Sequence, residues 1–398
     1  MLICIAGKNN IAVNVLEYII AEKQKYDYDI VCVLNKNDNR INSWQKSLGW
    51  YCKKNNIRIC TIDELYEKQD LVFLSLEFDQ IIRPHKFISD KLYNIHFSLL
   101  PEYKGMYTSV LPILHNKKET GVTFHRIRQG IDTGEIIAQK KIKIECEDTS
   151  LDVYNKCISV GSDLVIESLN RILKGENINM HMQPIEGSTY YSKSAIDYDN
   201  LELDVNCTGF QIYNQVRAFN FRPYQLISWN DFNIVDCEVS SNLSTEKPGT
   251  ILEQTGDSIT ISTIDYDTIL YIDHFHDLLL AIKEKNNDYA KHLIKIKKII
   301  NEKNDYGWSP LIVATYNNNK EMVNLLLDCG ADIYVKNNNG TNLLMYAKDC
   351  YANTGDPYLF ELFVEKGLDI QEEDYLNRNL IYYCNKQGIK KIGKYNIC

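Results

Sequence analysis

The stretch that decides the fold runs Asn94-Ile-His-Phe-Ser-Leu-Leu-Pro-Glu-Tyr-Lys-Gly105, followed by Gly121-Val-Thr-Phe-His125 and Gly130-Ile-Asp-Thr-Gly-Glu-Ile-Ile137. Three polar residues in it, Asn94, His96 and Asp132, stand among apolar residues that are typical of strand interiors. Successive side chains of a strand point to opposite faces, so Asn94 and His96 share one face. We therefore expect these three residues to form a site at the end of a strand.

The residues before this stretch alternate between apolar strands and helical patterns. A strand is expected at 2–6, a helix with apolar spacing at 11–22, and further strands at 29–34, 57–61 and 71–76. This alternation predicts an α/β fold with a doubly wound, Rossmann-like parallel sheet. Ligands bind at the carboxyl ends of the strands in such sheets. Gly7, Asn10 and the segment 94–96 are expected at that edge.

The combined motif resembles the formyltransferases that use N10-formyltetrahydrofolate. That family shares Asn-x-His, then Ser-Leu-Leu-Pro-x-x-x-Gly, and an Asp-Thr-Gly about thirty residues later, and this sequence carries all three parts. The resemblance spans residues 1–193. Within the family, the segment 107–114 is more similar to sugar-nucleotide N-formyltransferases than to the transfer-RNA or purine enzymes. The resemblance implies transfer of a formyl group from N10-formyltetrahydrofolate to the amino group of a dTDP-linked 3-amino- or 4-amino-dideoxyhexose, as in the synthesis of O-antigen or surface polysaccharide sugars.

The chemistry of amide formation suggests a role for each residue of the motif. His96, with an ordinary pKa of about 6.5, would take the proton of the attacking amine. Asn94 would donate a hydrogen bond to the oxygen that becomes negative, and Asp132 would orient the imidazole or assist proton movement. No metal and no covalent enzyme intermediate are required. Taken singly, each residue also has a structural reading: His96 as a core residue, Asp132 as a turn former and Asn94 as a strand cap.

Two further segments are candidates for ligand contact. The segment 75–84 resembles the one that lines the folate pocket, where Leu76, Phe78 and Ile81 would pack on the pterin; alone, it reads as a surface loop with a buried Phe. The turn that follows the first strand lacks the glycines of a dinucleotide fingerprint. Its Lys8 and Asn10 could hold an anion at a helix start, or an Asn there could simply cap the helix.

Residues 194–268 predict a small β-rich domain that follows the catalytic domain of residues 1–193. It has a helical pattern at 212–219 and short alternating runs afterwards. Arg217, Phe221 and Tyr224 resemble the region that receives the nucleotide in sugar-nucleotide formyltransferases, and Tyr107 is a further candidate for substrate contact. The alternative is that the aromatic residues fill the small core.

Residues 269–398 resemble ankyrin repeats. The segment 305–332 matches one repeat, the next begins 33 residues later, and a third starts near 374 after a four-residue insertion around 351–357. Upstream, 277–294 resembles a degenerate first repeat. Trp308 and Tyr306 lie in the loop between repeats, so we expect either a second nucleotide-sugar site built round Trp308 or packing of this residue against the β-rich domain.

Composition restricts the remaining possibilities. A net charge of -9 over 398 residues disfavours a nucleic-acid scaffold, and no apolar run approaches the roughly 20 residues that cross a bilayer. We expect a cytoplasmic enzyme whose partners are a small-molecule nucleotide sugar and further copies of itself in a homo-oligomer, without nucleic acid or membrane. Two alternatives stay open. One is an inactive formyltransferase fold that carries an ankyrin protein-binding module; the other is methionyl-tRNA formyltransferase, which fits the first 190 residues but neither the charge nor the tail.

Overall fold

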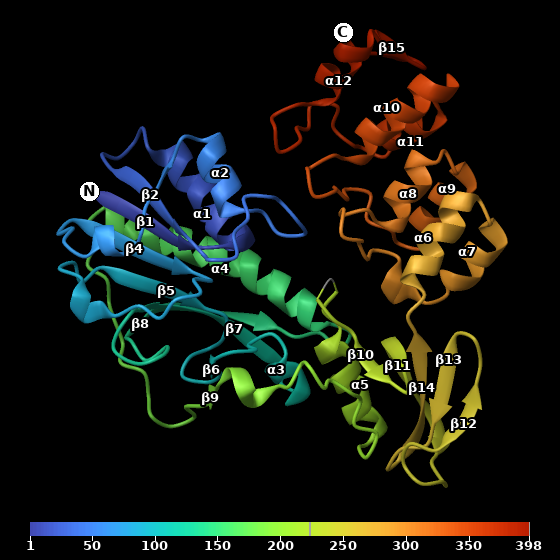
Figure 1. Cartoon of the computed structure of the whole chain (residues 1–398), viewed down its shortest axis with the longest axis horizontal. Coiled ribbons are helices and arrows are strands. Elements are labelled where there is room, and N and C mark those ends of the chain that lie inside the picture. The colour runs from blue at the N-terminus through green and yellow to red at the C-terminus, as the bar shows by residue number, and fades with distance from the viewer. Residues whose placement is uncertain (223, 398) are drawn as a thin grey trace. The chain divides into compact units, whose positions relative to one another are not determined.

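The computed structural model describes residues 1–222 and 224–397, which form two compact units (Figure 1). The first unit contains residues 1–203 and 214–221, and the second contains residues 204–213 and 222–398. Within the described residues, no helix combines the length and the apolar character that a membrane span requires.

The first unit is built on a seven-stranded sheet with the order β3-β2-β1-β4-β5-β7-β8. Its strands are β1 (Leu2–Gly7), β2 (Asp29–Leu34), β3 (Arg58–Ile59), β4 (Leu71–Leu76), β5 (Leu92–His96), β7 (Glu119–Arg126) and β8 (Ile136–Lys143). The strands from β3 to β5 pair in parallel, whereas β7 and β8 are antiparallel additions. Two short strands, β6 (Lys104–Gly105) and β9 (Tyr190–Tyr191), pair separately. The predicted α/β sheet is confirmed.

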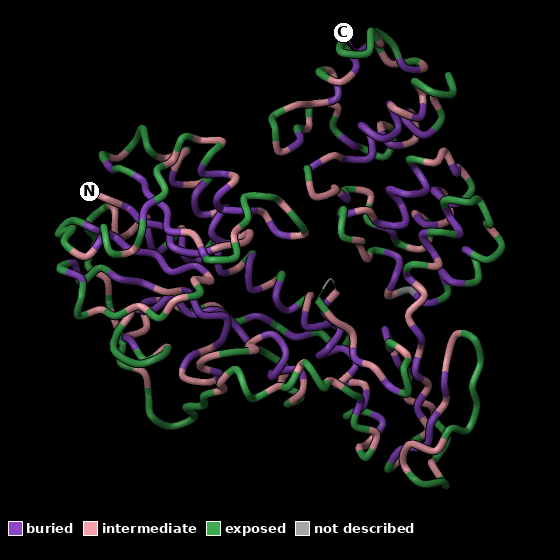
Figure 2. Tube along the Cα trace, viewed as in Figure 1, coloured by how far each residue is buried: buried purple, intermediate pink, exposed green. Residues whose placement is uncertain are grey.

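Three helices, α1 (Asn9–Glu22), α2 (Leu48–Lys54) and α4 (Ser150–Leu173), cover one face of this sheet. The short helix α3 (Leu111–Leu114) lies in the connection between β6 and β7. Helix α4 begins with a capping box in which the Thr149 and Asp152 side chains satisfy backbone N–H groups of the first turn. On the opposite face, strand residues such as Phe73 pack on Leu65 and Phe87 from the connecting loops. The central strands β1 and β4 are almost wholly buried (Figure 2), which explains their unbroken apolar sequences.

The second unit begins with an antiparallel sheet of five strands in the order β10-β11-β14-β13-β12. The strands are β10 (Ile227–Trp229), β11 (Phe232–Leu243), β12 (Ile251–Gln254), β13 (Ser258–Ile261) and β14 (Tyr266–Ile272). Helix α5 (Gly209–Phe219) precedes them and crosses the division between the units at residue 214. The predicted β-rich segment is therefore confirmed.

The rest of the second unit consists of helix pairs. They are α6 (Phe275–Glu284) with α7 (Asn287–Leu293), α8 (Pro310–Tyr316) with α9 (Lys320–Asp328), and α10 (Leu343–Thr354) with α11 (Tyr358–Glu365), followed by α12 (Leu380–Gln387) and the hairpin β15 (Lys391–Ile392) and β16 (Tyr395–Asn396). Ser309, Asn342 and Asn379 cap α8, α10 and α12 through their side chains. These caps lie 33 and 37 residues apart, because α10 contains the four-residue insertion. The predicted ankyrin repeats and their interruption are confirmed.

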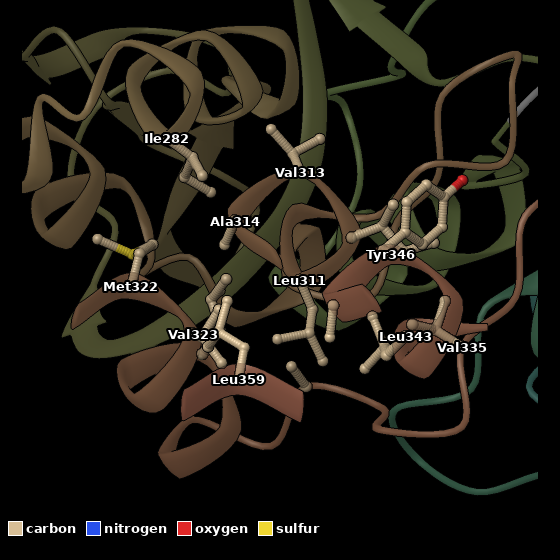
Figure 3. Close-up of a cluster of buried hydrophobic side chains, with 14 of the residues drawn as sticks. Ile282, Leu311, Val313, Ala314, Met322, Val323, Val335, Leu343, Tyr346 and Leu359 are labelled. Carbon is tan, nitrogen blue, oxygen red and sulfur yellow. The ribbon is translucent and has the colours of Figure 1, made fainter. Parts of the chain in front are cut away.

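One apolar core runs through all the repeats. Figure 3 shows side chains from successive helices, among them Ile282, Leu311, Met322, Leu343 and Leu359, meeting in a single cluster. A repeat cannot bury its apolar face alone, so this shared core is what holds the array together. The core also includes Val235 of β11. The predicted second and third domains therefore fold as one compact unit, while the boundaries at 193 and 268 stay a prediction.

Candidate active site

Strand β5 places Asn94 and His96 at the carboxyl edge of the parallel sheet. Asn94 lies opposite Ser75 of β4 on one side and opposite His125 of β7 on the other. His96 is the last residue of the strand and is buried. The two side chains emerge on the same face because they are two residues apart, as the sequence predicts.

The loop between β7 and β8 brings Asp132 to the same place. Its Oδ2 lies 3.4 Å from Nδ1 of His96 and accepts a 2.9 Å hydrogen bond from the backbone N–H of Gly105. Its Oδ1 lies 3.5 Å from Nδ2 of Asn94. The three predicted residues thus lie together, with Asn94 and His96 both beside the carboxylate of Asp132.

The loop that contains Asp132 has an uncommon backbone conformation. Asp132 has a φ of 53°, in the left-handed region that costs a residue with a side chain about 1 to 2 kcal/mol. Two residues later, Gly134 lies so close to the carbonyl of Arg126 that a Cβ would stand 1.7 Å from the oxygen. The Asp-Thr-Gly motif therefore describes a tight turn that aims a carboxylate into the site.

The hydrogen bonds of His96 fix which ring nitrogen carries the proton. Nε2 lies 2.7 Å from the carbonyl oxygen of Tyr103, which can only accept, so Nε2 carries a hydrogen and donates it. In the neutral ring the lone pair is then on Nδ1, beside Asp132. A proton taken up by Nδ1 would therefore face a carboxylate, which stabilises the imidazolium ion.

His125 of β7 is a fourth member of the site that sequence reasoning did not single out. It is 2% exposed. Its Nδ1 donates to the carbonyl oxygen of Arg126, and its Nε2 accepts from Nδ2 of Asn94 at 3.0 Å. It also lies 3.6 Å from Asp132 Oδ1. The sequence shows a His within an apolar strand at this position. It does not show that this His lies beside Asn94, because that depends on the register between β5 and β7.

Burial and neighbouring charges shift the pKa values of His96 and Asp132 in opposite directions. Burial lowers the pKa of His96, and the nearby Asp132 carboxylate offsets only part of that effect. Burial would raise the pKa of Asp132, but His96, His125 and the Gly105 N–H together hold it well below its ordinary range. At neutral pH the site therefore contains an ionised carboxylate beside a largely neutral imidazole, which is the state that a general base requires. Among the described residues, no group of three or more His, Cys, Asp or Glu side chains could hold a metal ion.

The residues predicted to contact folate differ in accessibility. The Leu76 side chain is fully buried at the end of β4, and Phe78 packs edge-on against Phe73 with ring centroids 6.5 Å apart. Ile81 is 77% exposed. Leu76 thus offers only its backbone to a ligand, whereas Phe78 and Ile81 still present apolar surface in the segment that follows β4. Their contact with folate stays a prediction.

Lys8 and Asn10 flank the start of α1, as predicted. Lys8 is the residue before the helix and makes no side-chain capping bond. Asn10 Oδ1 accepts from the backbone N–H of Lys46, and its own N–H donates to Gln45 Oε1, both at 2.9 Å. Asn10 therefore anchors the loop around residue 45, and its role as an anion ligand stays a prediction.

Tyr107, Arg217 and Phe221 all belong to the first unit. Tyr107 donates its hydroxyl to the carbonyl of Lys193, and its ring lies 5.4 Å from that of Tyr198. Arg217 is 6% exposed and donates to the carbonyls of Glu145 and Asp148.

Phe221 is buried against Trp44 and Tyr154. Both contacts lie in the first unit, so Phe221 packs there and not in the core of the β-rich domain, where the alternative interpretation placed it. Tyr224 belongs to the second unit and is 65% exposed. Nucleotide contact by Arg217, Phe221 and Tyr224 stays a prediction.

Trp308 and Tyr306 line a cavity of about 720 Å³ in the second unit, to which Arg222, Lys283 and Lys303 also contribute. The Trp308 ring packs on Tyr316 at 5.1 Å and on Tyr346 at 5.5 Å, while Tyr306 is 75% exposed. Burial lowers the pKa of Lys303, whose ammonium donates to the carbonyl of Lys336. Trp308 therefore packs within the repeats and also borders an open cavity, whose lining contains Asp273 and Asp305 besides the three basic residues.

Known families match most of the chain in three consecutive segments. Residues 63–169 match the formyl transferase family, residues 195–277 its C-terminal domain, and residues 278–374 the ankyrin repeats in three copies. WlaRD, a sugar 3N-formyl transferase solved with dTDP and 5-N-formyl-THF, is 40% identical with a TM-score of 0.63; the match covers 69% of this chain and 98% of WlaRD. The chain belongs to the sugar N-formyltransferase family. An N-formyltransferase from Helicobacter canadensis, solved with folinic acid and dTDP-3-aminofucose, is 41% identical over 69% of this chain and all of its own, with a TM-score of 0.62.

Methionyl-tRNA formyltransferases match the chain at lower identity than these two enzymes. Methionyl-tRNA formyltransferase of Staphylococcus aureus strain MW2 is 26% identical over 296 residues, which are 70% of this chain and 91% of that enzyme. The higher identity to the sugar enzymes agrees with the resemblance of the segment 107–114.

Proposed function

We propose that this protein transfers the formyl group of N10-formyltetrahydrofolate to the 3-amino group of a dTDP-linked 3-amino-dideoxyhexose. The main support is that Asn94 and His96 both lie beside the carboxylate of Asp132. The chain also matches two sugar N-formyltransferases over nearly their whole length. The names of those two relatives, a 3N-formyl transferase and an enzyme bound to dTDP-3-aminofucose, favour the 3-amino over the 4-amino sugar.

His96 serves as the general base in this proposal. The amine nitrogen forms a bond to the formyl carbon, the bond from that carbon to the folate nitrogen breaks, one proton leaves the amine and one reaches the folate nitrogen. Nδ1 of His96 takes the amine proton because Nε2 is already committed to Tyr103. Asp132, 3.4 Å from Nδ1, stabilises the resulting imidazolium.

Asn94 stabilises the negative charge that develops on the formyl oxygen. One N–H of its amide is held by His125, which fixes the plane of the group. The second N–H lies 3.5 Å from Asp132, a length at which a hydrogen bond is weak, so the formyl oxygen can take its place. The donor N10-formyltetrahydrofolate supplies the formyl group.

The remaining predicted residues would bind the two substrates. Phe78 and Ile81, with the backbone of Leu76, would hold the folate ring, since apolar surface beside a few backbone groups suits a planar heterocycle. The nucleotide sugar would be held by Lys8, Asn10, Tyr107, Arg217 and Phe221 of the first unit.

We further propose that the cavity beside Trp308 is the second nucleotide-sugar site. Its volume of about 720 Å³ lies in the usual range for ligand pockets. Lys283 and Lys303 would attract a diphosphate, whereas Arg222 is paired with Asp273 and Glu302. Trp308 and Tyr306 offer aromatic faces for a base. Calorimetric titration with dTDP should give two sites per chain, and Trp308→Ala should leave one; unchanged stoichiometry with only a lower melting temperature would exclude the second site.

The cellular role follows from the substrate class. A formylated dTDP-sugar is an activated building block, so we propose a role in surface polysaccharide synthesis, including lipopolysaccharide, in the cytoplasm. A homo-oligomeric state is proposed as well. A pull-down that recovers a stoichiometric protein partner with an inactive enzyme would favour the alternative of an ankyrin scaffold.

Release of tetrahydrofolate tests the proposed reaction. The purified chain is incubated with the donor and with one acceptor at a time: a dTDP-3-amino sugar, the 4-amino isomer, or methionyl-tRNA. We expect turnover with the 3-amino sugar, little with the others, and loss of turnover in His96→Asn. Absence of turnover with every amino sugar would refute the proposal, as would a full rate in His96→Asn.

A further inference from the structure

The segment that follows α4 holds both sides of the active site. At one end, the backbone of His181 pairs with that of Ile136, just after the Asp132 turn. At the other end, β9 pairs with β6, which contains Gly105, and Thr189 Oγ1 accepts from the N–H of Tyr103 at 2.7 Å. The segment 181–191 therefore contacts the two loops that supply the partners of His96.

Gln183 makes the most direct contact within this segment. Its Nε2 donates to the carbonyl oxygens of Asp132 and Gly134, both at 2.8 Å. Its Oε1 is buried without a hydrogen-bond partner among the described residues. Two carbonyl acceptors require the nitrogen of the amide, so the group acts as a double donor.

The conformation of Asp132 explains why such a donor matters. Residues with a side chain adopt the left-handed conformation infrequently, so contacts from outside the turn help to keep the Asp132 carboxylate aimed at His96. Gln183 holds the carbonyl of Asp132 itself and that of Gly134. If these bonds are lost, the turn can relax and the carboxylate can move away from Nδ1.

We propose that Gln183 is a positioning residue for the formyl transfer, which sets the geometry and protonation of the His96 and Asp132 pair without touching either substrate. The inference rests on the proposed function for its kinetic readout, but the protonation of His96 can be measured without any substrate.

Two substitutions separate the hydrogen bonds from the space that the side chain fills. Gln183→Glu keeps the shape but places a carboxylate against two carbonyl oxygens, and Gln183→Ala removes the group. Asn179→Asp is the matched control, because it adds the same charge at an exposed position just before the segment 181–191.

We expect kcat to fall about ten- to a hundredfold in both Gln183 variants, since a shift of about 1 Å in a reacting group has effects of this size. KM for both substrates should stay within about twofold, because ground-state binding is unaffected. The activity of Gln183→Glu relative to the wild type should recover as the pH falls from about 8 to about 5.5, because a protonated carboxyl can donate again. Asn179→Asp should show none of these changes.

Histidine NMR of the substrate-free chain provides the independent measurement. The pKa of His96 should fall in Gln183→Ala, which adds no charge, as the Asp132 carboxylate moves away, whatever acceptor the enzyme uses. An unchanged titration of His96 together with an unchanged kcat would overturn the role of Gln183, as would a rise in KM alone or a melting-temperature loss alone. If the wild type shows no turnover but the Gln183 substitution still changes the pKa of His96 as expected, the result counts against the proposed reaction and not against the role of Gln183.

Discussion

Replacing Asp132 by Asn removes the charge that the site uses to stabilise an imidazolium. Two unit charges 3.4 Å apart, the distance from Nδ1 of His96 to Oδ2 of Asp132, interact with about 5 kcal/mol at an effective dielectric constant of roughly 20. Shifts caused by such neighbours in proteins are about 1 to 3 pKa units. Each unit corresponds to about 1.4 kcal/mol, so kcat should fall by about 10- to 1000-fold if His96 Nδ1 becomes charged in the transition state.

The sign of the pH effect distinguishes this mechanism from general damage to the site. His96 must be neutral to act as a base, so kcat/KM falls on the acid side with the pKa of His96. The Asp132 carboxylate raises that pKa, and its loss should move the acidic limb to lower pH by about 1 to 3 units. Asp90→Asn is the control, since Asp90 is an exposed carboxylate that pairs with Arg126 instead. An unchanged midpoint in Asp132→Asn, or a midpoint moved to higher pH, would refute the reasoning.

Three further predictions concern catalysis and stability. Asn94→Ala should lower kcat by about 10² to 10³ with little change in KM, because a donor to a developing oxyanion is removed, and steady-state kinetics would show otherwise if KM alone rose. Phe360→Ala should destabilise the ankyrin array by about 3 to 5 kcal/mol in urea titrations, since this side chain is fully buried, whereas Tyr382→Ala at a 48% exposed position should have a small effect. Thermal stability should decrease as the pH falls below about 6.5. Burial lowers the pKa of His96 in the folded protein, so the unfolded chain binds more protons than the folded one in this range. A melting temperature that rises on acidification would contradict this.

The fold was predictable wherever the sequence pattern is local. The apolar strands 29–34 and 71–76 begin and end where the periodicity indicated. The ankyrin period was readable because similar segments recur 33 residues apart, from Gly307 to Gly340. The longer spacing before Asn379 follows from the extension of α10.

The parts of the site that depend on register or on chain crossing were not predictable. His125 joins Asn94 only because β7 is antiparallel to β5 in one particular register. Gln183 reaches the Asp132 turn from 51 residues away, through a segment without periodicity. Arg217 was proposed as a diphosphate ligand by its type, whereas its burial and its backbone carbonyl partners are set by tertiary packing.

The most direct measurement is a single-turnover reaction with donor that carries an isotopic label in its formyl carbon, with a dTDP-3-amino-dideoxyhexose as acceptor. The account predicts that the label appears in an amide at C3 of the sugar, at a rate that His96→Asn and Asp132→Asn reduce. Label recovered in free formate, in methionyl-tRNA when that acceptor is added, or on the sugar at an equal rate in both variants would contradict it.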